Sequence, residues 1–237
     1  MVRLSTVFCL LLMAVGLAGS APAAECRLGP DELDALVKRF APVLAQTAEI
    51  PAPPEKMLYR AAIADDGRTL LLAYHIVWPY EQDPRPGFWP AVTRLFYTGG
   101  LKLQRVIYGP GDVEVLVLAI DLATAKIVRV NYETATYDAK GGVVHVPLQV
   151  ESAALPGYEP LFFRVISWNH LFKLESAPPA STDQTIRLEP QPFTDQLWSY
   201  YRMTKKAQGP LSLDRDHPAW EDGEDLCCPR RQPAPKP

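Results

Sequence analysis

The sequence predicts a mainly β protein, an antiparallel β-sandwich with flanking N- and C-terminal helices. Six segments combine apolar alternation with turn residues at their ends, as the strands of a two-layer sheet protein do. Long stretches of helical periodicity occur only near the two ends of the predicted domain. Because strands do not alternate with long helices, a parallel α/β sheet is not expected.

The first 24 residues have the parts of a cleavable export signal. Arg3 supplies a positive start, residues 7–17 form an apolar core, and residues 20–24 are small, as a signal peptidase requires. A membrane helix needs roughly 20 apolar residues, and no stretch of the chain reaches that length. We therefore expect an exported protein, periplasmic or secreted, without a transmembrane segment. It would comprise a signal peptide (1–24), a single domain (25–213) and a polar, Pro-rich tail (214–237).

The predicted elements follow in chain order. Residues 30–32 open a helix with acids in its first turn, and its apolar spacing continues to residue 44 with a kink at Pro42. A hairpin comes next, in which residues 57–64 and 69–80 are joined through Asp-Asp-Gly at 65–67. Alternation along the second strand places His75 and Val77 on one face. The other face carries Tyr74, Ile76, Trp78 and Tyr80.

The second half of the chain continues as strands. Prolines and glycines interrupt residues 81–100, which leave room for a short helix at 89–96. The remaining strands are expected at residues 113–121, 126–134, 143–150 and 160–168, and a closing helix at 194–206. This order completes six strands between terminal helices.

The cysteines of the mature chain lie at its opposite ends, at Cys26, Cys227 and Cys228. In an oxidising compartment we expect a disulfide from Cys26 to one of the adjacent pair, which leaves one thiol over. The sequence does not choose between Cys227 and Cys228. A lipid anchor at Cys26 is the second interpretation of that residue, although Glu25 suits a lipidation signal poorly.

Composition argues against several functions. Without Arg3 the chain carries 23 basic and 27 acidic residues, a balance that gives nucleic acid no electrostatic reason to bind. The sequence has no phosphate-binding glycine loop, so a nucleotide cofactor is not expected, and no nucleophile elbow.

Two carboxylates at the start of one predicted strand are the strongest functional signal. Asp112 and Glu114 are separated by one residue, so they share a face of the strand. Two like charges this close need a cation, an arginine or a shared proton. In a purely structural role, Asp112 would be a turn residue and Glu114 would form a salt bridge to Arg105 or Arg129.

Three histidines could reach the same rim from neighbouring strands. His170 follows the end of a predicted strand, where side chains commonly reach a site, and is the best candidate. His145 stands between two valines and is interpreted as a hydrogen-bonded core residue. His75 is intermediate, because its aromatic neighbours could equally form a packed core. Two carboxylates with one histidine suit calcium, magnesium or manganese.

Three motifs follow one another in the chain. Trp-Pro-Tyr at residues 78–80 ends one predicted strand, and Gly-Asp-Val-Glu at residues 111–114 begins another. The third segment begins with Pro-Leu-Phe-Phe at residues 160–163 and continues to Asn169-His170. This order resembles the necrosis- and ethylene-inducing protein superfamily and the related fungal vacuolar-sorting-associated proteins. Chains of that family carry Gly-Asp-Trp-Glu or His-Asp-Trp-Glu, followed by a strand that ends in Ser-His. The resemblance covers roughly residues 58–174 and implies a β-sandwich.

In the toxin branch of that family the acidic motif holds a divalent cation beside a membrane-headgroup site. By this resemblance Asp112, Glu114 and His170 would be the cation ligands, and a lipid or sugar headgroup a possible partner. The sequence departs from the motif, because Val113 replaces its tryptophan and glycines at 109 and 111 stand where the toxins have histidines. Toxin activity therefore does not follow.

Three hypotheses remain open at this stage. The leading one is an exported, non-enzymatic β-sandwich protein that binds a divalent cation and a polar ligand at the rim with Asp112, Glu114 and His170. The second is a metal-dependent hydrolase in which Glu114 acts as the base. The third is a structural or protein-interaction module of the cell envelope.

Overall fold

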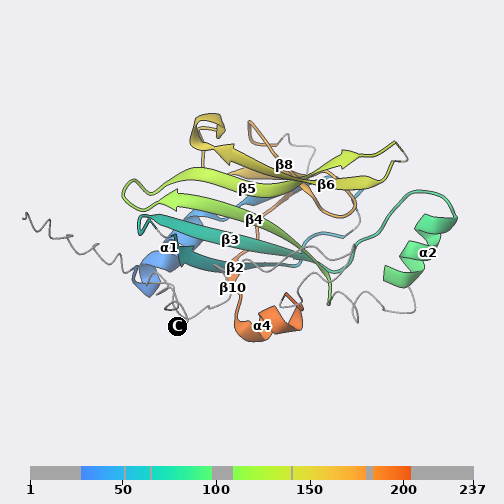
Figure 1. The fold of residues 1–237 in the computed structure, drawn as a ribbon, viewed down its shortest axis with the longest axis horizontal. Helices are drawn as coiled ribbons and strands as arrows, with labels where there is room; N and C mark the ends of the chain where they lie inside the picture. Colours follow the sequence, from blue (N-terminus) through green and yellow to red (C-terminus); the bar gives the residue numbers. More distant parts are fainter. Residues whose placement is uncertain are drawn as a thin grey trace, which may run out of the picture.

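The computed structural model describes residues 28–50, 52–64, 66–97, 109–139, 141–179 and 184–203, which form two mixed β-sheets and three α-helices (Figure 1). One sheet has six strands in the order β10-β2-β3-β4-β5-β6. Its strands are β2 (Lys56–Ile63), β3 (Thr69–Trp78), β4 (Asp112–Asp121), β5 (Lys126–Tyr137), β6 (Val143–Glu151) and β10 (Pro190–Pro192). The other has the order β8-β7-β1-β9, with β1 (Val43–Gln46), β7 (Phe162–Val165), β8 (Phe172–Leu174) and β9 (Gln184–Ile186).

The long strands confirm the predicted β-sandwich. Each of the pairs β2–β3, β3–β4, β4–β5 and β5–β6 is antiparallel. Helix α2 (Phe88–Tyr97) confirms the short helix predicted within the Pro- and Gly-rich segment. The prediction was wrong in one respect, because β1 pairs with β7 and β10 pairs with β2 in parallel.

The first helix is shorter than its periodicity predicts. Helix α1 (Pro30–Phe40) ends two residues before Pro42, and residues 43–46 form strand β1. The residue before a proline is biased toward extended backbone, and Ala41 adopts φ −54° and ψ 121°. The two apolar residues that continued the helical pattern, Val43 and Leu44, are instead fully buried in a strand.

The larger core lies between the two sheets, and α1 closes one side of it. Leu33, Val37 and Phe40 of α1 join the even-numbered side chains of β3 and β4 and the phenylalanines of β7 and β8 there. The opposite face of the six-stranded sheet carries a smaller core under α4 (Asp195–Tyr200). The two α-helices therefore cover opposite faces of the same sheet.

Helix α4 is held to the sheet by a buried arginine. The Arg60 side chain is 3% exposed, its Nε donates to the Phe193 carbonyl oxygen, and its guanidinium lies 4.0 Å from the Trp198 ring centroid. His75 lies on the same face, with ring centroids 4.8 Å from Phe193 and 5.5 Å from Trp198. The aromatic-core interpretation of His75 is therefore the one that the structure supports.

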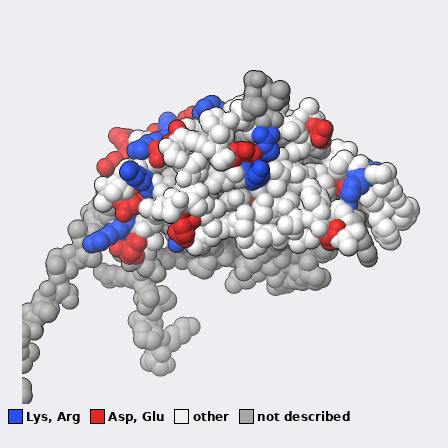
Figure 2. Space-filling view, turned by 90° about the horizontal axis from the view of Figure 1, so that it is seen from above, with Lys and Arg blue, Asp and Glu red and all other residues white. Residues whose placement is uncertain are grey.

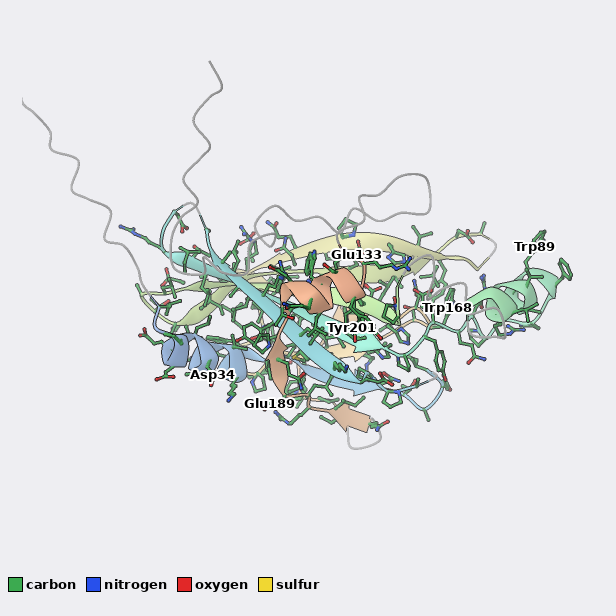
Figure 3. The ribbon with its side chains drawn as sticks, turned by 90° about the horizontal axis from the view of Figure 1, so that it is seen from below. Asp34, Trp89, Glu133, Trp168, Glu189 and Tyr201 are labelled. Atoms are coloured by element: carbon green, nitrogen blue, oxygen red, sulfur yellow. The ribbon has the colours of Figure 1, made fainter. Side chains whose placement is uncertain are left out.

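Helix α2 projects from the end of the sandwich (Figures 1 and 3), with Trp89 near its tip. Arg94 donates to the carbonyl oxygens of Asp83 and Arg85, and Arg85 donates to the Gly141 carbonyl oxygen in the β5–β6 turn. Burial acts to raise the pKa of Asp83, but its hydrogen bonds from Arg85 hold that pKa below the usual value. The tip beyond this anchor is nearly without charge (Figure 2).

Several predictions lie outside the described residues. They are the signal peptide, the three cysteines Cys26, Cys227 and Cys228, and the Pro-rich tail. Within the described ranges, no helix combines the length and the apolar character that crossing a bilayer requires.

Candidate functional site

The two acidic residues stand at the start of β4, on the face that looks toward the second sheet. Asp112 pairs in register with Trp78 and Glu114 with Ile76, so all four side chains share that face. Gly111 makes the entry possible, because its φ is 89° and a Cβ there would collide with the Trp78 carbonyl oxygen. Both carboxylate residues are buried, Asp112 at 2% and Glu114 at 6% exposure.

His170 reaches Asp112 from the turn between β7 and β8. Its Nδ1 lies 2.7 Å from Asp112 Oδ2, and its ring stacks on Trp78 with 4.5 Å between centroids and 8° between planes. The backbone of His170 has φ 62°, a left-handed conformation that costs a non-glycine residue about 1–3 kcal/mol. The turn is closed by hydrogen bonds from Leu171 N–H to Ser167 Oγ and from His170 N–H to the Ser167 carbonyl.

The structure brings Asp112 and His170 into contact, but His170 is not on a strand end at the surface. It is fully buried, with 0% exposure. No ion pair joins Glu114 to Arg129 within the described ranges. Arg105, the other proposed partner, lies outside them.

A second histidine belongs to this end of the sandwich, and its sequence interpretation was wrong. His145 lies on the edge strand β6, where its Nδ1 is 2.6 Å from Glu133 Oε2 and its Nε2 is 2.8 Å from Asn169 Nδ2. Its side chain is 27% exposed, so it is not a core residue. Asn169 directly precedes His170, which brings the two histidine clusters together at one turn. We call the set the acidic end: Glu81, Asp112, Glu114, Glu133, His145, Asn169 and His170.

Carboxylates dominate the electrostatics of the acidic end. The hydrogen bond to Glu133 raises the pKa of His145 above its usual value, against the opposing effect of partial burial. The negative charges of Glu133, Glu81 and Asp112 act in the same direction as the hydrogen bond. These carboxylates therefore favour the protonated, positively charged form of His145.

The raised pKa of His145 predicts a pH dependence of stability. A group whose pKa is higher in the folded protein stabilises it below the unfolded pKa, which is about 6.5 for histidine, and this stability is lost as pH rises through the folded pKa. We therefore expect Glu133→Gln, which removes the main cause of the shift, to destabilise the protein more at pH 6 than at pH 8.5. Urea unfolding at the two pH values measures this.

The matched control for this prediction is Glu151→Gln, since Glu151 is an exposed carboxylate of β6 farther from His145 along the strand. A Glu133→Gln effect of equal size at both pH values would contradict the assignment. The pKa itself can be followed by NMR titration of the His145 ring, and it should fall in the variant.

The chemistry available at the acidic end is recognition of a cation or a hydrogen-bond donor. Asn169 is 5% exposed, and its Oδ1 is a buried acceptor without a hydrogen-bond partner among the described residues. The described residues contain no group of three or more His, Cys, Asp or Glu side chains arranged to hold a metal ion. Asp112 and His170 contact each other in the structure.

The fold and the acidic end define a β-sandwich protein with a negatively charged, histidine-containing site at one end. No family model matches the sequence, and no curated protein matches it either. Two of the similar solved structures are described as NLPPya in complex with glucosamine and NLPPya in complex with mannosamine. They share 14% and 15% identity with this chain, at TM-scores of 0.44 and 0.42, and each alignment covers 78% of this chain and 85% of the other.

A third similar structure is described as a toxin fold for microbial attack and plant defense. It is 13% identical, with a TM-score of 0.38, and the alignment covers 73% of this chain and 78% of that one. All three similarities are distant, with identities of 13–15%.

Proposed function

We propose that the protein is an exported binding protein, whose acidic end holds a small polar ligand that carries positive charge. One observation carries the proposal: His145 is partly exposed, bonds to Glu133 and Asn169, and stands in the field of three carboxylates. A ligand with an ammonium group would satisfy that field, whereas an anion would be repelled.

Asn169 narrows the chemical class of the ligand. Its Oδ1 is a buried acceptor that no donor among the described residues reaches, and such an acceptor is stabilised when a donor does reach it. Hydroxyl and ammonium groups are both donors. An amino sugar combines an ammonium group with several hydroxyls on a compact ring, so it is the ligand class that we propose.

The divalent cation expected from the sequence belongs to the same proposal. Asp112 and Glu114 would supply carboxylate oxygen ligands and His170 a nitrogen ligand, for calcium, magnesium or manganese. Because Asp112 Oδ2 is hydrogen-bonded to His170, a cation at this carboxylate would have to replace that bond.

Thermal unfolding with added ligands tests both parts. Glucosamine is compared with glucose, which has the hydroxyls but no ammonium group, and each of the three metals is titrated separately. A ligand at 100 times its dissociation constant adds about 2.7 kcal/mol of stability if it binds only the folded protein. We expect glucosamine to raise Tm and glucose to have a smaller effect.

Variants locate the binding site. Glu133→Gln should abolish most of the shift with glucosamine, and the double variant Asp112→Asn/Glu114→Gln should abolish any shift with a metal. Lys126→Gln, at the opposite end of the sandwich, is the matched control and should respond as wild type does. Equal shifts with glucose and glucosamine, or shifts that survive in Glu133→Gln, would show that the acidic end is not the amino-sugar site.

A further inference from the structure

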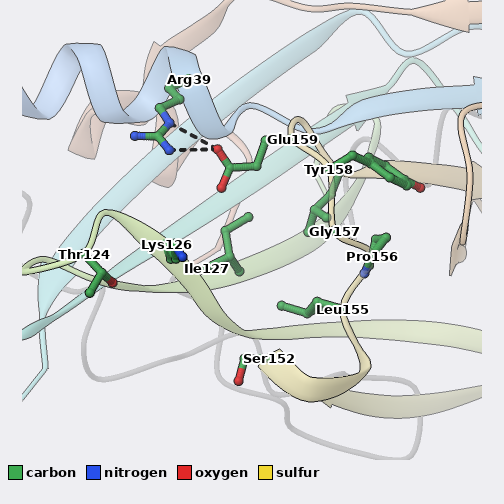
Figure 4. Close-up of a pocket in the computed structure, with 11 residues that line it drawn as sticks. Arg39, Thr124, Lys126, Ile127, Ser152, Leu155, Pro156, Gly157, Tyr158 and Glu159 are labelled. Atoms are coloured by element: carbon green, nitrogen blue, oxygen red, sulfur yellow. Dashed lines mark hydrogen bonds and ion pairs between the residues drawn. The ribbon is translucent and has the colours of Figure 1, made fainter.

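A second candidate site lies at the other end of the sandwich. A cavity of about 540 Å³ opens between the last turn of α1, the β4–β5 turn and residues 152–161 (Figure 4). Strand β4 runs from the acidic end at Asp112 to this turn, ten residues or roughly 30 Å away. The volume lies within the range of small-molecule sites, about 300–1,000 Å³.

The charged groups of this cavity leave an excess of one positive charge. Arg39 Nε and Nη2 lie 3.1 and 3.0 Å from Glu159 Oε2, so this carboxylate balances the guanidinium. Lys126 also lines the cavity, is exposed, and forms no ion pair within the described ranges. Because the whole chain has a formal charge of −3, this local excess is opposite in sign to the protein as a whole.

Another part of the cavity lining is apolar. Leu161 is 2% exposed and belongs to the main core, and Ile127 and Leu155 pack against that core from the cavity side. The Ser152 side chain adds a hydroxyl at the rim. The cavity therefore combines one uncompensated ammonium group with a preformed apolar surface.

We propose that this cavity binds a small amphiphilic monoanion, with a carboxylate head at Lys126 and a short aliphatic body against Ile127, Leu155 and Leu161. A single excess charge matches a carboxylate better than a phosphate dianion, which is more strongly held by two uncompensated cations. This site is separate from the acidic end and does not depend on the function proposed there.

Octanoate is the probe, and octylamine, of equal chain length and opposite charge, is its control. A ligand of ten heavy atoms at about 0.4 kcal/mol per atom has a dissociation constant on the order of 1 mM. Isothermal titration should show saturable binding of octanoate near this value, with binding of octylamine at least fivefold weaker.

Two charge variants have opposite expected signs. Lys126→Gln removes the uncompensated cation and should weaken octanoate binding about threefold, as an exposed ion pair does when it is lost. Glu159→Gln releases the Arg39 guanidinium from its carboxylate and should tighten binding about threefold. If octanoate bound only through apolar contacts, neither variant would change its affinity.

A third variant fills the cavity. Gly157 lines it, and a Cβ at this position meets nothing within 4 Å, so we expect a leucine in Gly157→Leu to occupy part of the cavity. Octanoate binding should fall at least tenfold in Gly157→Leu while the urea midpoint stays near that of the wild type.

The proposal is overturned if octylamine binds as tightly as octanoate, or if the two charge variants shift affinity in the same direction. It is also overturned if a folded Gly157→Leu protein retains wild-type affinity; should that variant not fold, the two charge variants decide. Glu133→Gln, at the acidic end, should bind octanoate as wild type does, so failure at one site is distinguishable from failure at the other.

Discussion

Replacement of Trp78 by alanine is expected to lower the free energy of unfolding by about 4 kcal/mol, the usual cost of truncating a buried tryptophan. Trp78 is fully buried at the end of β3 and packs on Phe172, with 6.0 Å between ring centroids. It also forms the stacking surface for His170. Urea unfolding measures the stability loss, and NMR of the His170 ring measures its displacement.

Trp78→Phe is the matched control. Phenylalanine retains a ring for His170 but loses the indole N–H, which donates to Gln46 Oε1 over 3.4 Å, and leaves a smaller void. We expect this variant to lower the free energy of unfolding by about 1.5 kcal/mol. If the alanine variant costs no more than the phenylalanine variant, Trp78 does not support the turn at His170 in the way the structure indicates.

Trp78 also illustrates what could be predicted from the sequence. Alternation along β3 predicts that Trp78 and His75 lie on opposite faces, and the structure confirms this with separate cores on the two faces. The hairpins could be predicted because turn residues and alternation are local signals. Their register then follows from the burial of one face, which a shift of one residue would reverse.

The parts that could not be predicted depend on contacts between distant residues. Strand β1 has four residues and pairs with β7, more than a hundred residues later in the chain. Its apolar residues continue the helical spacing of α1, so only the partner strand decides their conformation. The three-residue strands β8, β9 and β10 are likewise too short to have a pattern of their own.

His145 was misjudged for a different physical reason. A histidine between two valines suggests a buried strand, but β6 is the edge of its sheet and its Val144 is 43% exposed. Alternation then carries no information about which face is buried. On the neighbouring strand β5, Ala135 pairs in register with His145. Glu133 is two residues before Ala135, so it lies diagonally opposite His145 on the same face. Only the β5–β6 register reveals this contact.

The second large effect concerns the buried pair of Asp112 and His170. Asp112→Ala is expected to lower the free energy of unfolding by about 3 kcal/mol. The substitution removes the group bonded to His170 Nδ1 at a place where both side chains are almost inaccessible to water, with exposures of 2% and 0%. A buried polar group that loses its partner bears its full desolvation cost. Chemical denaturation gives the magnitude.

Asp112→Asn is the comparison that isolates this cause, because an amide oxygen can still accept a hydrogen bond from His170. We expect Asp112→Asn to lower the free energy of unfolding by about 1 kcal/mol. In the double variant Asp112→Ala/His170→Ala, the second substitution should cost less than His170→Ala alone, since each single change already breaks the bond. Fully additive costs would mean that the Asp112–His170 contact contributes nothing to stability, and other contacts, among them the Ser167 hydrogen bonds and the Trp78 stack, would then support the positive φ at His170.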